Sequence, residues 1–140
     1  MDVSYILDDL NDAQREAVTS ESKKLLVLAG AGSGKTKVLV HRIAWLIKAL
    51  SNSTHSILSV TFTNKAANEM TGRIESILDQ PIPEMWCGTF HSISNRLLRR
   101  HYKEAGLEKD FNILDSDDQL RIIKRNLKDL LIKHRLKYLI

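Results

Sequence analysis

The segment from Ala29 to Thr36, with glycines at positions 30, 32 and 34, constrains the fold more than any other part of the sequence. It follows the apolar run 25–28, which is typical of a buried strand, and precedes apolar residues at helical spacing over 39–50. Glycines at a strand-to-helix turn let successive backbone N–H groups converge on an anion, and the positive end of the helix adds to this site. The pattern is that of a phosphate loop, G-x-x-x-x-G-K-[ST], except that Ala29 holds the place of the first glycine.

The last two residues of this segment carry the expected chemistry. Lys35 supplies a positive charge for the β- and γ-phosphates of a nucleotide, and the Thr36 hydroxyl is placed to ligate Mg²⁺. The structural alternative is a glycine-rich turn with an incidental Lys-Thr pair. A dinucleotide site is excluded, because the glycines run G-x-G-x-G and no acidic residue ends the second strand.

A phosphate loop also needs an aspartate at the end of a second apolar strand to hold Mg²⁺. The nearest candidate is the segment 112–115, but its apolar run is short and no glutamate follows Asp115. The next four residues, from Ser116 to Gln119, are better explained as a capping box that opens a helix. The hydrolytic half of the site is therefore not found in this sequence.

Strand and helix patterns alternate along the first part of the chain, which predicts an α/β fold with a parallel sheet and flanking helices. The expected strands cover 25–28, 57–62 and 85–90. The expected helices start at an Asn11 cap with Gln14 as its partner, follow the phosphate loop over 39–50, and cover 66–77, 92–105 and the stretch from Ser116. The alternation stops after Asp115, which divides the chain into 1–114 and 115–140.

Composition narrows the class of protein. With 43% hydrophobic and 27% charged residues in 140, the chain is one globular domain or a piece of a larger one. No apolar run reaches the roughly 18 residues of a membrane span, and residues 1–4 lack a signal-peptide pattern, so no membrane partner is expected. The single cysteine, Cys87, excludes an internal disulfide and favours a reducing, cytoplasmic setting.

The net charge of +4 is unevenly distributed along the chain. The surplus lies beyond residue 120, where seven basic residues face one acid, Asp129. These basic side chains either contact phosphates or form a solvated helix face. They are Arg121, Lys124, Arg125, Lys128, Lys133, Arg135 and Lys137.

Four motifs occur in a fixed order: Leu10–Val18, Ala29–Thr36, Thr61–Ala67 and Gly88–Ser92. Together they resemble the N-terminal part of superfamily 1 DNA helicases of the UvrD/PcrA/Rep group, and residues 1–5 and 40–46 are most similar to its UvrD members. The resemblance covers residues 1 to about 130 and nothing in 133–140. It implies a partial RecA-like motor domain, 1A, over 1–114, which runs into the start of a helical subdomain, 1B, at 115–140. The Asp-Glu box and the second motor domain of such helicases are not in this sequence.

The resemblance implies that ATP and Mg²⁺ are the cofactors. The implied catalytic residues are Lys35 and Thr36, with Thr36 reaching Mg²⁺ bound to ATP. The implied nucleotide contacts are Gln14, Ala29, Gly30, Ala31, Gly32, Ser33, Gly34, Lys35, Thr36 and Lys37. Gln14 would contact adenine, although its spacing alone favours a helix cap. Lys37 stands where relatives often carry arginine, and since lysine lacks a planar guanidinium, its stacking on the base is in doubt.

The resemblance also implies single-stranded DNA contacts at two strand-to-helix turns. They are Thr61, Phe62, Thr63, Asn64 and Lys65 in the first turn and Thr89, Phe90 and His91 in the second. Without the resemblance, Phe62 would be interpreted as a core residue, Thr63 and Asn64 as an ordinary helix cap, and His91 as a polar surface residue. The basic residues Arg96, Arg99 and Arg100 belong either to the DNA track or to a solvated face.

These residues lead to one main hypothesis and two alternatives. The chain is expected to be the ATP- and single-stranded-DNA-binding N-terminal portion of an ATP-dependent 3′-to-5′ helicase of DNA repair and replication. Its partners would be single-stranded DNA, junctions with duplex DNA, and repair proteins, and the 140 residues should not unwind DNA by themselves. The alternatives are a non-catalytic nucleotide- or DNA-binding remnant and a small phosphate-loop kinase. Because the strand 25–28 would lack neighbours, the 140-residue chain is also expected to self-associate or to be only marginally stable.

Overall fold

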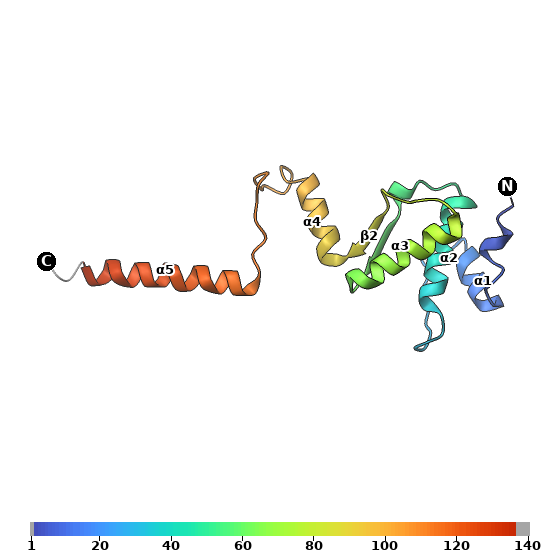
Figure 1. Ribbon diagram of the computed structural model, residues 1–140, viewed down its shortest axis with the longest axis horizontal. Coiled ribbons are helices and arrows are strands. Elements are labelled where there is room, and N and C mark those ends of the chain that lie inside the picture. Colours follow the sequence, from blue (N-terminus) through green and yellow to red (C-terminus); the bar gives the residue numbers. More distant parts are fainter. Residues whose placement is uncertain (1, 137–140) are drawn as a thin grey trace. The chain divides into compact units, whose positions relative to one another are not determined.

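The computed structural model describes residues 2–136, and side chains up to residue 130 (Figure 1). The elements in chain order are η1 Ser4–Ile6, α1 Asp12–Thr19, α2 Lys35–Lys48, η2 Thr54–Ser56, β1 Leu58–Thr61, α3 Asn64–Leu78, β2 Trp86–Thr89, α4 Phe90–Arg100 and α5 Ser116–Leu136. The chain divides into two compact units, Met1–Leu98 and Arg99–Ile140, so that the division falls inside α4. The expected assignment of 1–114 to subdomain 1A and 115–140 to subdomain 1B stays a prediction.

The first unit contains a small parallel sheet. β1 and β2 pair in register from Leu58 opposite Trp86 to Thr61 opposite Thr89, and α3 connects them and packs on both strands. A parallel pair needs such a crossover, usually a helix. The α/β class predicted from the sequence is confirmed, whereas the RecA-like sheet order stays a prediction.

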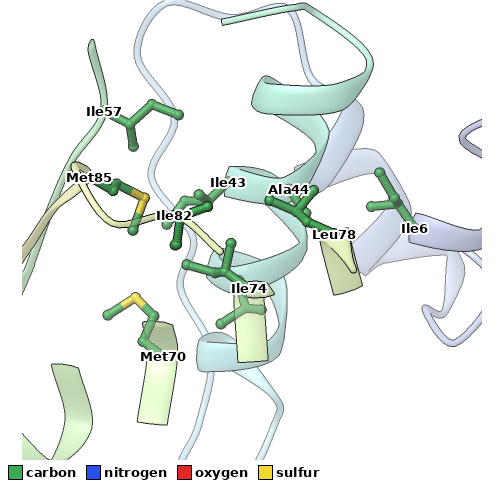
Figure 2. Packing of buried hydrophobic residues seen from close by; sticks show 10 residues of the cluster. Ile6, Ile43, Ala44, Ile57, Met70, Ile74, Leu78, Ile82 and Met85 are labelled. Atoms are coloured by element: carbon green, nitrogen blue, oxygen red, sulfur yellow. The ribbon is translucent and has the colours of Figure 1, made fainter. Parts of the chain in front are cut away.

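The core of this unit forms where α2 and α3 pack against each other. Apolar residues three and four apart on both helices, including Ile43 on α2 and Ile74 on α3, meet Ile6 from η1 and Met85 from the segment before β2 (Figure 2). Helical spacing places such residues on one face, which explains why this face is buried. The full set is Ile6, Val40, Ile43, Ala44, Ile57, Met70, Ile74, Leu78, Ile82 and Met85. The helix that follows the phosphate loop is thereby fixed to the helix that follows β1.

The segment predicted as a buried strand, 25–28, is neither a strand nor buried in the structure. The side chains of Leu26 and Leu28 are 80% and 84% exposed, and those of Leu25 and Val27 are 47% and 39% exposed. The alternation is strand-like, with Leu25 and Val27 lining a hollow of about 300 Å³ beside α1 and α2. A strand needs ladder hydrogen bonds to a neighbour, and the described residues form only the β1–β2 pair. The prediction that the chain self-associates stays untested.

The ends of two helices, α4 and α5, also differ from those predicted. α4 starts at Phe90 rather than at Ser92, because the Thr89 hydroxyl already accepts the Ser92 N–H at 3.2 Å. It ends at Arg100 rather than at Ala105, and the next turn closes at Gly106, which has a left-handed φ of 68°. The cap of α5 is Asp115, whose carboxylate accepts the Asp118 N–H at 2.8 Å, and not a box opened by Ser116. The capping box predicted for α1 is confirmed.

The second unit is dominated by α5, whose apolar residues at helical spacing are exposed. They are Leu120, Ile123, Leu127 and Leu130. Arg121, Lys124, Arg125 and Lys128 share this helix, whereas Lys133, Arg135 and Lys137 lie outside the described side chains. Within residues 2–136, none of the helices combines the length and apolarity required to cross a bilayer.

The C-terminus of α3 offers a test of local strain. Asp79 follows this helix with φ 50° and ψ 38°, a left-handed conformation that glycine adopts without strain, and it places a negative charge at the negative end of the helix dipole. We expect Asp79→Gly to raise the free energy of unfolding by about 1 kcal/mol, measured by urea denaturation. Asp79→Ala is the control, because it removes the charge but keeps the strained Cβ. Equal stability of the two variants would contradict the strain argument.

Candidate nucleotide site and strand-end surface

The phosphate loop, residues 29–36, turns through two left-handed glycines. Gly32 has φ 76° and Gly34 has φ 87°, and Gly34 forms the N-cap of α2. Ser33 closes the turn, because its hydroxyl donates to the Gly30 carbonyl at 2.7 Å. Within the described part of the chain, no side chain caps α2, so the first amides of this helix are open to an external acceptor. This arrangement is suited to a phosphate group.

Lys35 lies over the phosphate loop itself. Its Nζ donates to the carbonyl oxygens of Ala29 at 2.8 Å and of Gly30 at 2.5 Å, while the side chain of Thr36 is exposed on the first turn of α2. The donor set fits a nucleotide with its magnesium ion, since the loop offers amides and an ammonium to phosphates and a hydroxyl to the metal. The described residues include no cluster of three His, Cys, Asp or Glu side chains that could hold a metal. Thr36 as a ligand of magnesium bound to ATP stays a prediction.

Gln14 lies next to the phosphate loop. Its Oε1 accepts the Asn11 N–H at 3.2 Å, which completes the capping box, and its Nε2 donates to the Ser33 carbonyl at 3.3 Å. Gly34 requires glycine because of its φ of 87°, and a Cβ there would lie 2.9 Å from Gln14 Nε2, so any side chain at this position would displace the Gln14 amide. The cap interpretation of Gln14 is confirmed, and adenine contact stays a prediction.

A hollow of about 240 Å³ separates α1 from the segment that leads into the phosphate loop. Its lining combines amide and ammonium groups with apolar side chains, as ligand pockets commonly do. The lining residues are Asn11, Ala13, Gln14, Ala17, Val27, Leu28, Ala29, Ser33, Lys35 and Val38. The structure thus brings Gln14 together with Lys35 at one cavity.

The two predicted DNA-contact segments meet at one edge of the sheet. Thr61 and Thr89 are register partners at the ends of β1 and β2, so Phe62 and Phe90 follow at the same edge. Phe62 is 96% exposed and Phe90 is 65% exposed, which shows that the alternative interpretation of Phe62 as a core residue is wrong. Two aromatic rings on a parallel strand edge could stack with bases.

The other polar residues of these segments also lie on the surface. Thr63 caps α3 by accepting the Ala66 N–H at 3.1 Å, so its hydroxyl already has a structural partner. Asn64, Lys65 and His91 are exposed on the first turns of α3 and α4. No ladder hydrogen bond joins the segment 25–28 to β1 or β2 in the described part, and the packing of α2 on α3 links the phosphate loop to this strand-end surface.

Two of the three arginines of α4 contact aromatic rings. The Arg96 guanidinium lies 4.3 Å from the centroid of the Trp86 ring, and that of Arg99 lies 4.0 Å from the centroid of Phe111. Such stacking stabilises the local structure and keeps the planar charge near the surface. Neither contact decides whether Arg96, Arg99 and Arg100 belong to a DNA track.

Three basic side chains of α2 have roles that the sequence analysis did not predict. They hold the N-terminal segment by its backbone, which leaves no pattern in the side chains of that segment. A signal was available for two of them, because His41 and Arg42 interrupt the apolar run 38–47. The contacts, each 2.5 Å long, join Lys37 Nζ to Asp9 O, His41 Nδ1 to Ile6 O, and Arg42 Nη1 to Val18 O.

Known proteins resemble this chain over most of its sequence. It is 59% identical to DNA helicase II of Salmonella typhimurium and 60% identical to DNA helicase II of Escherichia coli K12, each over 128 residues and 91% of this chain. It is 49% identical to the ATP-dependent DNA helicase PcrA of Bacillus subtilis over 126 residues, or 90% of this chain. The aligned region makes up 17–18% of the length of these relatives.

A protein family also matches this chain over most of its length. The family described as "UvrD/REP helicase N-terminal domain" matches residues 10–139. This range includes Gln14, the phosphate loop and both strand-end segments, so the resemblance stated from the motifs is confirmed. Because the match runs through nearly the entire sequence, the chain belongs to the UvrD/REP helicase N-terminal domain family.

Proposed function

We propose that the chain is the ATP- and single-stranded-DNA-binding N-terminal portion of an ATP-dependent 3′-to-5′ DNA helicase of repair and replication. The whole protein would act at junctions of single-stranded and duplex DNA, together with repair proteins. The observation that carries the proposal is the uncapped start of α2 behind two left-handed glycines, with Lys35 and Thr36 on its first turn. The names of the relatives, which include an ATP-dependent DNA helicase, support it.

In the nucleotide site, different residues would bind the phosphates, the magnesium ion and the adenine base. The loop amides and the start of α2 would bind the phosphates, and Lys35 would exchange its loop carbonyl partners for phosphate oxygens. The exposed Thr36 hydroxyl would orient magnesium, which neutralises charge on the β- and γ-phosphates when it is bound. Gln14, held beside Ser33, would contribute its amide to the adenine edge.

On the strand-end surface, Phe62 and Phe90 would stack with bases, and groups at the starts of α3 and α4 would contact phosphates. Base stacking on aromatic rings tolerates any sequence, as a translocating protein requires. Lys65 and the amides at the start of α3 would supply the salt-sensitive part of binding. With one motor domain represented, we expect weak DNA affinity.

We further propose that these 140 residues bind ATP without sustained turnover. No Asp-Glu pair occurs among them, and the resemblance implies that the arginines that face the phosphates belong to the second motor domain. A non-catalytic nucleotide- or DNA-binding remnant is the alternative for the chain as it stands. A small phosphate-loop kinase has less support, because neither a candidate magnesium acid nor an arginine-bearing lid is found.

A pair of measurements on the 140-residue chain tests this proposal. We expect labelled ATP to bind in a Mg²⁺-dependent way, and oligothymidine to bind weakly and less tightly as salt rises. Phosphate release should stay at background with or without oligothymidine, since the sequence offers no candidate residue to place the attacking water. Sustained DNA-stimulated hydrolysis in a clean preparation would contradict the proposal that these residues bind ATP without turnover. The absence of any Mg²⁺-dependent ATP binding would overturn the proposed function itself.

A further inference from the structure

The turn between η1 and α1, residues 7–10, is held by two basic side chains. Arg15 donates from Nε and Nη2 to the carbonyl oxygens of Leu7 and Asp8, at 3.1 and 3.4 Å. Lys37 Nζ donates to the carbonyl oxygen of Asp9 at 2.5 Å. Three successive carbonyls thus accept from cations, but only Lys37 reaches across from another helix, α2. Lys37 is therefore a tether between this turn and the helix that starts at the phosphate loop.

The tethered turn leads directly to Gln14. Leu10, the last residue of the turn, is buried against Val38 of α2, and Asn11 caps α1. The capping box then fixes the Gln14 side chain, whose Nε2 donates to the Ser33 carbonyl in the phosphate loop. Any displacement of the turn would move the Asn11 cap, and with it the Gln14 amide.

Lys37 is placed to act through this tether rather than on the nucleotide base. A lysine ammonium is a compact point charge that hydrogen-bonds in three directions, and it lacks the planar face with which a guanidinium stacks. Its side chain is partly buried, and its charge is engaged with a main-chain oxygen. A charge-assisted hydrogen bond of this kind is stronger than a neutral one, so its loss should loosen the turn.

We propose that Lys37 is a positioning residue for base recognition: it tethers residues 7–10 to α2 and so holds Gln14 at the phosphate loop. The inference rests on the proposed binding of ATP. It predicts that Lys37 sets how much adenine adds to affinity, while the phosphates bind to the loop whether the tether is present or not.

The test compares Mg²⁺-ATP with Mg²⁺-tripolyphosphate, which lacks the base, by equilibrium titration of the 140-residue chain. Lys37→Met removes the charge at similar length, and we expect it to weaken ATP binding about tenfold and tripolyphosphate binding less than about twofold. Lys37→Arg can still reach the carbonyl and should restore most of the ATP affinity. Lys48→Met removes a charge from the other end of α2 and is the matched control, with no effect on either ligand.

A double-mutant cycle with Gln14→Ala separates positioning from direct contact. If Lys37 acts through Gln14, Lys37→Met has no further effect in the Gln14→Ala background. Additive losses would mean that Lys37 contacts the nucleotide by itself, and equal weakening of both ligands would mean general damage to the site; either result overturns the inference. Hydrogen exchange without ligand should show faster exchange of α1 amides in Lys37→Met only, and unchanged exchange would also overturn it. A wild-type chain that binds neither ligand would overturn the proposed function, and the inference with it.

Discussion

Replacing Lys35 with alanine should weaken Mg²⁺-dependent ATP binding by roughly ten- to a hundredfold, because one ammonium group is expected to serve two phosphate oxygens. The structure shows the Lys35 ammonium already lying at the mouth of the loop, within 2.8 Å of two backbone carbonyl oxygens. Its substitution removes the only mobile charge within the loop sequence itself. Isothermal titration with a slowly hydrolysed ATP analogue measures the change.

The Lys35→Ala result needs a control for loop damage. Because the Lys35 ammonium also donates to carbonyl oxygens of the loop, its loss could distort the loop itself. The variant should therefore be compared with Lys35→Arg, which keeps a positive charge. Urea denaturation of each variant checks that folding is unaffected, and Lys24→Ala removes an exposed charge before the loop. ATP affinity that is the same in wild-type and Lys35→Ala chains would contradict the assignment of Lys35 to the phosphates.

Replacing Phe62 with alanine should weaken oligothymidine binding by about tenfold, since stacking of one base on an aromatic ring is worth about 1–3 kcal/mol. The side chain is 96% exposed, so its removal leaves no cavity and should not change the free energy of unfolding. Fluorescence anisotropy with labelled oligothymidine measures the loss. The stacking part should persist when salt is raised, whereas contacts to phosphates weaken.

The matched control for Phe62→Ala is Arg73→Ala, which removes an exposed cationic side chain from the middle of α3. Its loss should reduce binding less than the loss of Phe62, and only at low salt. Equal effects of the two substitutions would mean that binding is purely electrostatic and that Phe62 does not stack. Phe90 follows β2 at the same edge of the sheet, so Phe90→Ala should weaken oligothymidine binding about as much as Phe62→Ala does.

The parts of the fold that depend on local pattern could be predicted from the sequence. The Asn11–Gln14 capping box needs only residues three apart, and α2 and α3 follow from apolar residues at helical spacing. The predicted strands 57–62 and 85–90 each agree with the observed strands to within one residue at both ends. Where an element begins was harder to predict when a neighbouring side chain captured the cap, as Thr89 does for α4 and Asp115 does for α5.

The parts that depend on distant partners could not be predicted in this way. The run Leu25–Leu28 is apolar enough for a strand, but an apolar pattern says nothing about whether a neighbouring strand is present. Phe62 is exposed because the chain turns away from the sheet immediately after Thr61. The tether from Lys37 ends on a main-chain oxygen, an acceptor that every residue offers. The roles of Gln14, the loop and the strand-end residues stay predictions until binding is measured.

The unpaired run Leu25–Leu28 has a thermodynamic consequence for the loop that follows it. Residues 20–34 contain neither helix nor strand, so a nucleotide that binds the loop would also have to order the part of this backbone that no ladder hydrogen bonds hold. Fixing the backbone of one residue costs about 1–2 kcal/mol of conformational entropy, and this cost would lower the ATP affinity of the 140-residue chain. A strand that paired with Leu25–Leu28 would supply part of this order in advance and would raise ATP affinity without touching ATP. By thermodynamic linkage, bound ATP would raise the affinity of the chain for that strand by the same factor. Binding of the strand and binding of ATP would thus be coupled.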